Sequence, residues 1–472
     1  MINRTSRKEN NKKYDRKDPQ SIESYGKGLI GKTFRQLLPN EIENEDSINP
    51  VSEKQKENKG KLGLIIEKYW FGYEPNSNNQ PDFNEAGVEL KVSPIIETNN
   101  SFSAKERLVI TMINYKKDAN KTFENSHLRL KLYHILLVSY VYEKTKNPLD
   151  CTIKQVKLIN IPDADMRIIR DDYDRILKKI NSGYAHEISE ADTLYLGACT
   201  KGKNSHDCVQ QPYSDKLAKR RAFCLKQKYM TYFINKYVLL EKSDCIPILK
   251  NPTNVTFEEY IKKKINAYKG WSIEELCQKF NINNSAKNRT TTVAFKILGT
   301  KNNKAEEFIK ANIQVKSIRI SQNGSIKESM SFPYFDFKKL SSESWEDDLF
   351  AETLRITKFF FIVYIYKNDG KLYLNGCQFW NMPNSDIDKN VYEVWKRTKQ
   401  SINDGTCMIV SNGKIKYGFP KKKENPVCHV RPHGKNAQDT LELPDGRKCP
   451  KQCFWLNNTY IYSQLDTNVK TL

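Results

Sequence analysis

One short segment combines acidic and basic residues in a spacing that could do chemistry. Residues 81–91 read PDFNEAGVELK, which places Asp82 ahead of a Glu-x-Lys triplet formed by Glu89 and Lys91. Carboxylates supply the hard oxygen ligands that Mg²⁺ takes together with waters and phosphate oxygens. A metal held there could polarise a phosphodiester and activate a bound water, while the lysine offsets charge on the phosphorus. The spacing is typical of a metal-dependent nuclease.

The same triplet also has a simpler interpretation. In a β-strand, Glu89 and Lys91 are two residues apart and project from one face, so they could form an ordinary surface ion pair. Short acidic patterns also recur by chance in a charged protein. The triplet alone therefore does not separate a half-buried strand from a catalytic site.

The composition favours a polyanionic partner. The chain has 472 residues, with 78 Lys and Arg against 56 Asp and Glu, for a formal charge of +22. Lys and Arg that neutralise phosphates gain from counterion release, which makes nucleic acid the simplest partner. The length allows about two or three domains with proper cores.

No segment indicates export or a membrane span. Residues 1–20 are polar and lack the apolar core of a signal peptide. The longest apolar and aromatic run, residues 359–366, is too short to cross a bilayer. The 11 cysteines are scattered without a secreted framework, which indicates reduced thiols. We therefore expect a cytoplasmic protein with no membrane contact.

Helices and strands alternate around the acidic segment. Apolar residues recur at helical spacing over residues 62–70, and Glu67 lies on that helix. Extended or apolar runs at residues 87–92, 108–113, 132–142 and 156–161 precede a helical pattern at residues 163–180. This alternation predicts an α/β domain with a mixed central sheet flanked by helices.

The second half of the chain repeats the first. Residues 307–317 read EFIKANIQVKS and match residues 82–92, which read DFNEAGVELKV. Further short matches follow at a nearly constant offset close to half the chain length, which a duplicated domain explains better than coincidence.

The two copies differ where chemistry would occur. Gln314 replaces Glu89, while Lys316 keeps the lysine and Glu307 stands in place of Asp82. Because a neutral amide is a poor Mg²⁺ ligand, we expect the second copy to have lost catalysis and kept the fold.

These patterns divide the chain into four expected parts. Residues 1–24 would be a disordered basic arm that contacts DNA or only solubilises the chain. Residues 25–240 would be the nuclease domain, and residues 241–265, which contain two prolines, a linker. Residues 266–472 would be the inactive second domain.

Short motifs also recur in a fixed order along the chain. They are KGxxGxxxE at 59–67, DFNEAGVELK at 82–91, FENSH at 123–127, CTKG at 199–202, QPYSD at 211–215, RAFCLK at 221–226, CHVRPH at 428–433 and FWLNN at 454–458. In these motifs the chain resembles the GATC-cutting type II restriction endonucleases related to the MutH mismatch-repair nickase. The resemblance implies two tandem restriction-endonuclease-like domains, of which only the first cuts.

The resemblance assigns catalytic roles within the first half. It implies that Asp82, Glu89 and Glu67 are metal ligands for Mg²⁺ and that Lys91 is the catalytic lysine. The chain carries one extra residue between Glu67 and Gly72, which departs from the family pattern.

The resemblance also implies DNA contacts by basic residues in these motifs. The expected contacts are Lys131, Lys201, Arg221, Lys226 and Arg431. Cys199 and Cys224 stand where the nickase has an arginine and a tyrosine, so base readout must differ in detail. Sensitivity to adenine methylation does not carry over.

Histidines and cysteines offer alternatives that we do not favour. For His127 and His134, a structural or phosphate-contacting role fits better than a general base, because a metal-bound water needs little further activation. A group of histidines and cysteines near the C-terminus could suggest a structural zinc site, but it lacks the paired Cys-x2-Cys spacing of such sites. Its members are Cys428, His429, His433, Cys449 and Cys453.

The sequence therefore predicts a Mg²⁺-dependent type II restriction endonuclease. It would hydrolyse double-stranded DNA at a short palindrome, GATC by the resemblance, and leave 5′-phosphate ends. With one intact site per chain, cutting both strands requires two molecules or two nicks, so we expect a transient homodimer on DNA. A cognate DNA methyltransferase would be the functional partner. The alternatives are a mismatch-repair nickase, which does not need the duplicated half, and a non-cleaving DNA-binding protein, which does not need an intact cluster.

Overall fold

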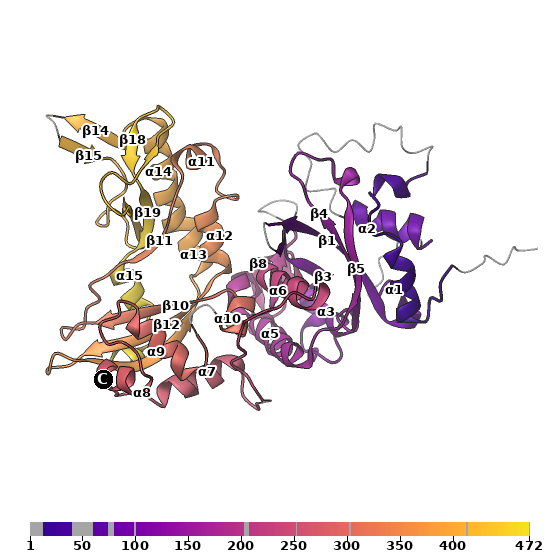
Figure 1. The fold of residues 1–472 in the computed structure, drawn as a ribbon, viewed down its shortest axis with the longest axis horizontal. Coiled ribbons are helices and arrows are strands. Elements are labelled where there is room, and N and C mark those ends of the chain that lie inside the picture. Colours follow the sequence, from indigo (N-terminus) through magenta and orange to yellow (C-terminus); the bar gives the residue numbers. More distant parts are fainter. Residues whose placement is uncertain are drawn as a thin grey trace, which may run out of the picture. The chain divides into compact units, whose positions relative to one another are not determined.

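Two compact units make up the chain in the computed structural model, which describes residues 13–39, 60–73, 80–98, 101–202, 207–251, 253–301, 304–411 and 414–471. The first unit contains Met1–His186 and Tyr195–Ser243, and the second contains Glu187–Leu194 and Asp244–Leu472 (Figure 1).

The main sheet of the first unit is mixed. Its strand order is β2-β1-β4-β5, with bounds Phe102–Ala104, Val88–Glu97, His134–Val141 and Ile153–Ile159. Strands β1 and β4 are parallel, and the other two pairings are antiparallel. Most of β4 is apolar and buried, as expected for a central strand. The acidic segment thus lies on a strand that is fixed on both sides.

A second, antiparallel sheet completes the first unit. Its order is β3-β9-β6, with bounds Leu108–Met112, Arg221–Leu225 and Leu196–Thr200. Helix α5 (Asp163–Asn181) is tied to this sheet because the Asp172 carboxylate accepts hydrogen bonds from the backbone N–H groups of Tyr195 and Leu196 at 2.6 and 2.9 Å. The hairpin of β7 (Cys208–Gln211) and β8 (Ser214–Lys219) extends from it. The remaining principal helices are α2 (Lys61–Ile65), α3 (Tyr115–Asp118), α4 (His127–Lys131) and α6 (Gln227–Phe233).

The ordered structure begins earlier than the sequence predicts. Helix α1 (Pro19–Lys27) starts with proline in the first turn, and the Asp18 carboxylate accepts from two backbone N–H groups. Ile22 is fully buried in the core of the first unit. Residues 19–24 therefore belong to a helix and not to the expected arm, because capping and one buried apolar side chain outweigh the polar composition. Residues 1–12 of that arm lie outside the described residues.

The second unit repeats this architecture. A sheet of order β10-β12-β13 has bounds Ile313–Ile320, Lys358–Tyr366 and Leu372–Trp380, and a sheet of order β11-β19-β16 has bounds Met330–Tyr334, Gln452–Leu456 and Cys428–Pro432. Parallel pairing sets Gln314 opposite Phe359, as Glu89 is set opposite Ile135 in the first unit. The prediction of tandem α/β units with mixed sheets is confirmed.

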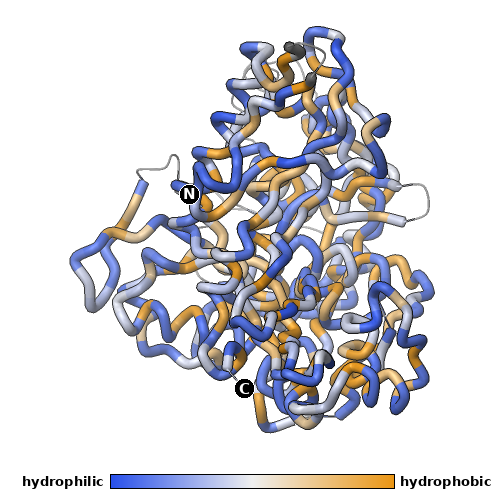
Figure 2. The backbone as a smooth tube through the Cα atoms, turned by 90° about the vertical axis from the view of Figure 1, so that its left-hand side faces the viewer, coloured by the Kyte–Doolittle hydropathy of each residue, from blue (hydrophilic) through white to orange (hydrophobic). Residues whose placement is uncertain are grey.

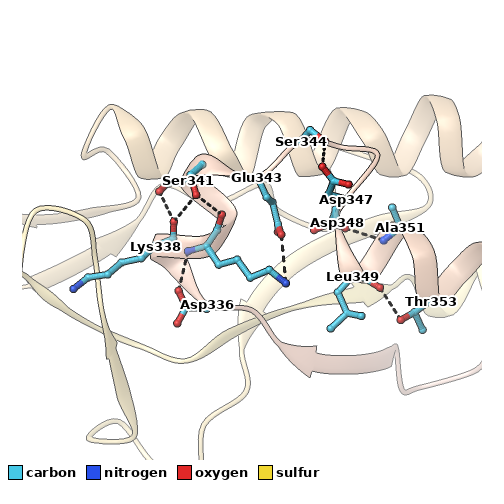
Figure 3. Close-up of polar contacts among 12 residues, drawn as sticks. Asp336, Lys338, Ser341, Glu343, Ser344, Asp347, Asp348, Leu349, Ala351 and Thr353 are labelled. Atoms are coloured by element: carbon cyan, nitrogen blue, oxygen red, sulfur yellow. Dashed lines mark hydrogen bonds and ion pairs between the residues drawn. The ribbon is translucent and has the colours of Figure 1, made fainter. Parts of the chain in front are cut away.

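Polar side chains fix the helices that precede strand β12. Asp336 begins α11 (Phe337–Ser342), and Asp348 begins α12 (Leu349–Ile356). Each carboxylate accepts from the backbone N–H three residues further on, at 2.9 and 2.8 Å (Figure 3). Helix α12 thus leads into β12 as α4 leads into β4.

Other helices of the second unit pack around its sheets. They include α7 (Phe257–Asn266), α8 (Ile273–Lys279), α9 (Arg289–Ile297), α10 (Glu306–Lys310), α14 (Tyr392–Asn403) and α15 (Asn458–Ser463). Helix α7 begins inside the expected linker, with Thr256 as its cap. Hydrophilic stretches recur along the whole tube in Figure 2, in line with the basic composition. Among the helices that the structure describes, none is both long and apolar enough to cross a membrane.

Candidate active site

A tight turn returns Asp82 to strand β1. The turn contains a short 3-10 segment, Asn84–Ala86, and closes at Gly87, whose φ of +65° lies in the left-handed region that favours glycine. The Asp82 carboxylate accepts a hydrogen bond from the backbone N–H of Leu90 at 2.9 Å. This contact fixes the acid beside the strand that carries Glu89.

Glu89 is the centre of a buried charge cluster. Its side chain is 1% exposed. Lys91 Nζ lies 2.6 Å from Glu89 Oε1, and Lys131 Nζ lies 3.0 and 3.1 Å from the two Glu89 oxygens. Lys131 is the last residue of helix α4. The predicted convergence of Glu89 and Lys91 on one face is confirmed, and a second lysine joins them.

Glu67 reaches the same cluster from a π-helical turn, Ile66–Trp70. Within this turn the Phe71 N–H donates to the Ile66 carbonyl at 3.0 Å, five residues back. A π turn adds one residue to a helix, and it therefore accommodates the extra residue seen in the sequence. Burial, and then the nearby Asp82 carboxylate, raise the pKa of Glu67 to about 7.

The cluster suits a divalent cation. Burial, and then the Glu89 carboxylate, raise the pKa of Asp82, so the acids sit where an added positive charge would stabilise their ionised forms. No three acidic, histidine or cysteine side chains in the described ranges are placed to hold an ion by themselves. This arrangement fits a hard ion that takes few protein ligands and fills its shell with water and phosphate oxygens.

Comparison with known proteins identifies the family. The family described as "DNA mismatch repair enzyme MutH" matches residues 71–172, which include the strand of the cluster. The type II restriction enzyme Sau3AI of Staphylococcus aureus is 35% identical over 95% of this chain and 98% of its own length. The chain belongs to the family of type II restriction enzymes related to MutH.

MutH proteins themselves match a smaller part of this restriction enzyme. Those of Shigella flexneri serotype 5b and Escherichia coli K12 are each 23% identical over 40% of the chain and 82% of their own length. A MutH-sized protein therefore corresponds to less than half of the restriction enzyme, whereas Sau3AI extends over both units.

The expected DNA contacts of the restriction enzyme divide into exposed and buried residues. Lys201 is exposed directly after strand β6, and Arg431 is exposed on β16 with its guanidinium 4.5 Å from the Trp455 ring centre. Arg221 and Lys226 are only 7% and 4% exposed. The structure thus leaves the first two available to a ligand.

Two of the expected DNA contacts are buried. Arg221 donates to the Ala198 carbonyl at 2.5 Å, because it begins the central strand β9 and turns its guanidinium onto the neighbouring strand β6. Lys226, which follows the same strand, is likewise buried. Both residues are therefore buried in this structure, and their role as DNA contacts stays a prediction. Lys131, also expected to contact DNA, forms an ion pair with Glu89, so it belongs to the acidic cluster.

One cavity beside the cluster includes residues that the sequence did not single out. Arg16 and Tyr73 line a pocket of about 310 Å³ together with Asp82. The Arg16 guanidinium lies 4.6 Å from the Tyr73 ring centre. Arg16 is far from Asp82 in the sequence and lay in the expected disordered arm, so no local pattern could connect the two.

The second unit of the restriction enzyme has rearranged the equivalent positions. The Glu307 carboxylate accepts backbone hydrogen bonds from Ile248 and Leu249, each at 2.9 Å. Arg355 precedes strand β12 as Lys131 precedes β4, yet it pairs with Asp388 at 2.8 Å. Acid and base therefore do not converge there as they do around Glu89.

Two of the histidines have an asparagine side chain as a hydrogen-bond partner. His134 Nδ1 lies 2.6 Å from Asn160 Oδ1 in the first unit, and His429, on strand β16 of the second unit, has its Nδ1 2.6 Å from Asn457 Oδ1. All 11 cysteines are free thiols. The C-terminal histidines and cysteines form no group of three that could hold a metal within the part of the chain that the structure describes.

A pH-dependent stability difference should report on Glu67. Its pKa is raised from 4.5 to about 7 in the folded chain, so the folded state binds more protons between these values than the unfolded state does. Its contribution to stability is therefore present below about pH 4.5 and is lost as the pH rises through about 7. Glu67→Gln, which mimics the protonated acid, should match the wild type near pH 5 and melt at a higher temperature near pH 8. Thermal unfolding in EDTA measures this, and a variant that is no more stable at pH 8 contradicts the placement of Glu67.

Proposed function

We propose that the first unit hydrolyses phosphodiester bonds of double-stranded DNA, with Mg²⁺ taking one or two of the Asp82, Glu89 and Glu67 carboxylates directly and completing its shell with water and phosphate oxygens. The observation that carries this proposal is the meeting of Glu89 with Lys91 and Lys131 beside Asp82. When bound, the metal would supply Lewis acidity and an activated water. Lys91 would orient the attacking water and offset the charge that develops on the phosphate.

We further propose that the enzyme recognises GATC and leaves 5′-phosphate ends. The motifs that the chain shares with GATC-cutting enzymes support this specificity. Lys201 is exposed next to the second sheet of the first unit, and we assign it as a DNA contact. Base-edge contacts in the major groove could then distinguish the four base pairs. The second unit would bind DNA without cutting it, and Arg431 is its exposed candidate contact.

The assembly and cellular setting are part of the same proposal. With one intact cluster in each chain, two copies would pair transiently on a palindrome to cut both strands. A methyltransferase that modifies the same sequence would protect the host DNA. The free thiols support a reducing, cytoplasmic setting.

A plasmid digest tests this function directly. With Mg²⁺, a plasmid that contains GATC should be cut into the fragments that its map predicts, and a matched plasmid without GATC should remain intact. EDTA should abolish cleavage of the plasmid that contains GATC. Sequencing the ends fixes the cut position. Fragments unrelated to GATC would refute the site, while accumulation of nicked circles alone would favour the nickase.

A further inference from the structure

A basic pocket lies in the second unit between strands β10 and β11. It has a volume of about 310 Å³, and Lys316 and Lys327 are among the residues that line it. Lys316 occupies the position of the catalytic Lys91 in the repeated strand. The pocket is therefore built on the second unit's counterpart of the active site.

Lys316 lacks the carboxylate that neutralises Lys91. In the first unit, Glu89 lies 2.6 Å from Lys91 Nζ, whereas the equivalent residue Gln314 is uncharged. The Lys316 side chain makes no hydrogen bond or ion pair with any residue that the structure describes, and burial lowers its pKa. A half-buried ammonium without a counter-charge costs free energy, which a bound anion would offset.

The other charges at the pocket also favour an anion. Glu328 is the acidic residue of the lining, and the Arg319 guanidinium neutralises it at 2.6 and 2.8 Å. Lys327 is exposed at the same pocket. The described lining therefore carries an excess of positive charge.

We propose that this pocket binds one phosphodiester group of duplex DNA without a metal ion, with Lys316 as the central cation. The inference rests on the proposed function of the second unit as a DNA-binding unit. A phosphodiester is the expected occupant because Lys316 stands where Lys91 would meet the scissile phosphate in the first unit. Loss of the acidic ligand thus converts a cutting site into a holding site.

Chemical labelling of lysines in the full-length protein tests this proposal. Amines are acetylated in EDTA with and without an excess of GATC duplex, and the modified residues are quantified by mass spectrometry. We expect duplex to protect Lys316, while Lys263 remains reactive. Lys263 is an exposed residue of helix α7, which packs against β13, the strand farthest from β10 in its sheet. Inorganic phosphate at matched ionic strength is the second probe.

Substitution gives an independent measurement. Lys316→Gln should weaken duplex binding in EDTA and reduce the slope of log K against log salt by about 0.9, the loss of one phosphate contact. Lys316→Arg should retain the slope, and Lys263→Gln should leave it unchanged.

The outcomes separate this inference from the proposed function. An unprotected Lys316, protection by inorganic phosphate but not by duplex, or an unchanged salt slope in a folded Lys316→Gln protein would each overturn the inference. Cleavage of the GATC plasmid with Mg²⁺ is measured on the same preparation. A protein that cuts GATC but leaves Lys316 unprotected refutes only the pocket, whereas one that does not cut refutes the function itself.

Discussion

Replacing Glu89 with alanine should lower the cleavage rate by a factor on the order of a thousand or more. Glu89 supplies a proposed metal ligand, and its carboxylate is also the common partner of Lys91 and Lys131. DNA binding in EDTA should remain largely intact, because phosphate contacts made elsewhere dominate affinity. Single-turnover cleavage and gel-shift assays measure the two effects separately. Asp82→Ala and Lys91→Ala should behave in the same way, and Glu67→Ala should do less damage.

Glu89→Gln is the better-matched variant for folding. Alanine would leave two buried ammonium groups without their partner, which is strongly destabilising. Glutamine keeps the volume and reproduces the residue found at position 314 in the second unit. Thermal unfolding then separates loss of fold from loss of catalysis. A folded Glu89→Gln protein that still cuts near the wild-type rate would remove Glu89 from the catalytic site.

Dividing the chain between Ser243 and Asp244 should have the second largest effect; Glu187–Leu194, which belongs to the second unit, then stays with the first fragment. A fragment of residues 244–472 should shift DNA in a gel without cutting it, because Gln314 has replaced the central carboxylate. The fragment must start near Asp244 because Ile248 is buried and its backbone N–H donates a hydrogen bond to the Glu307 carboxylate. A later start would remove this support.

The complementary fragment tests what the second unit contributes. A fragment of residues 1–243 should bind DNA about 10² to 10⁴ times more weakly than the whole chain, since two linked binding units act at high effective concentration. Its cleavage at low enzyme concentration should fall accordingly. Equal rate and equal selectivity of this fragment and the whole chain would show that the second unit is not an effector.

Local patterns in the sequence predicted the central strand and its chemistry. Glu89 and Lys91 share a face because side chains in a strand alternate, and no tertiary information is needed for that inference. The duplication was likewise visible, because Gln314 and Lys316 keep the spacing of their counterparts. Both the fold class and the family therefore follow from short-range features.

The environment of basic residues could not be read in the same way. Arg221 and Lys226 are basic residues of a motif that the sequence assigns to DNA contact, yet both are buried in the structure. Lys131 meets Glu89 across 42 positions of sequence, and only the fold brings them together. Whether a lysine or arginine faces solvent depends on long-range packing, which a local pattern does not contain.

The contacts around Glu307 and Arg355 make the divergence of the second unit hard to reverse. The Glu307 carboxylate accepts hydrogen bonds from the backbone N–H groups of Ile248 and Leu249, and Arg355 forms an ion pair with Asp388. A glutamate at position 314 would therefore supply one metal ligand, while Glu307 and Arg355 would still be held by their contacts within the second unit. We therefore expect a Gln314→Glu protein to remain unable to cut DNA. The hydrogen bonds and ion pairs that these positions now make thus keep the two units chemically distinct.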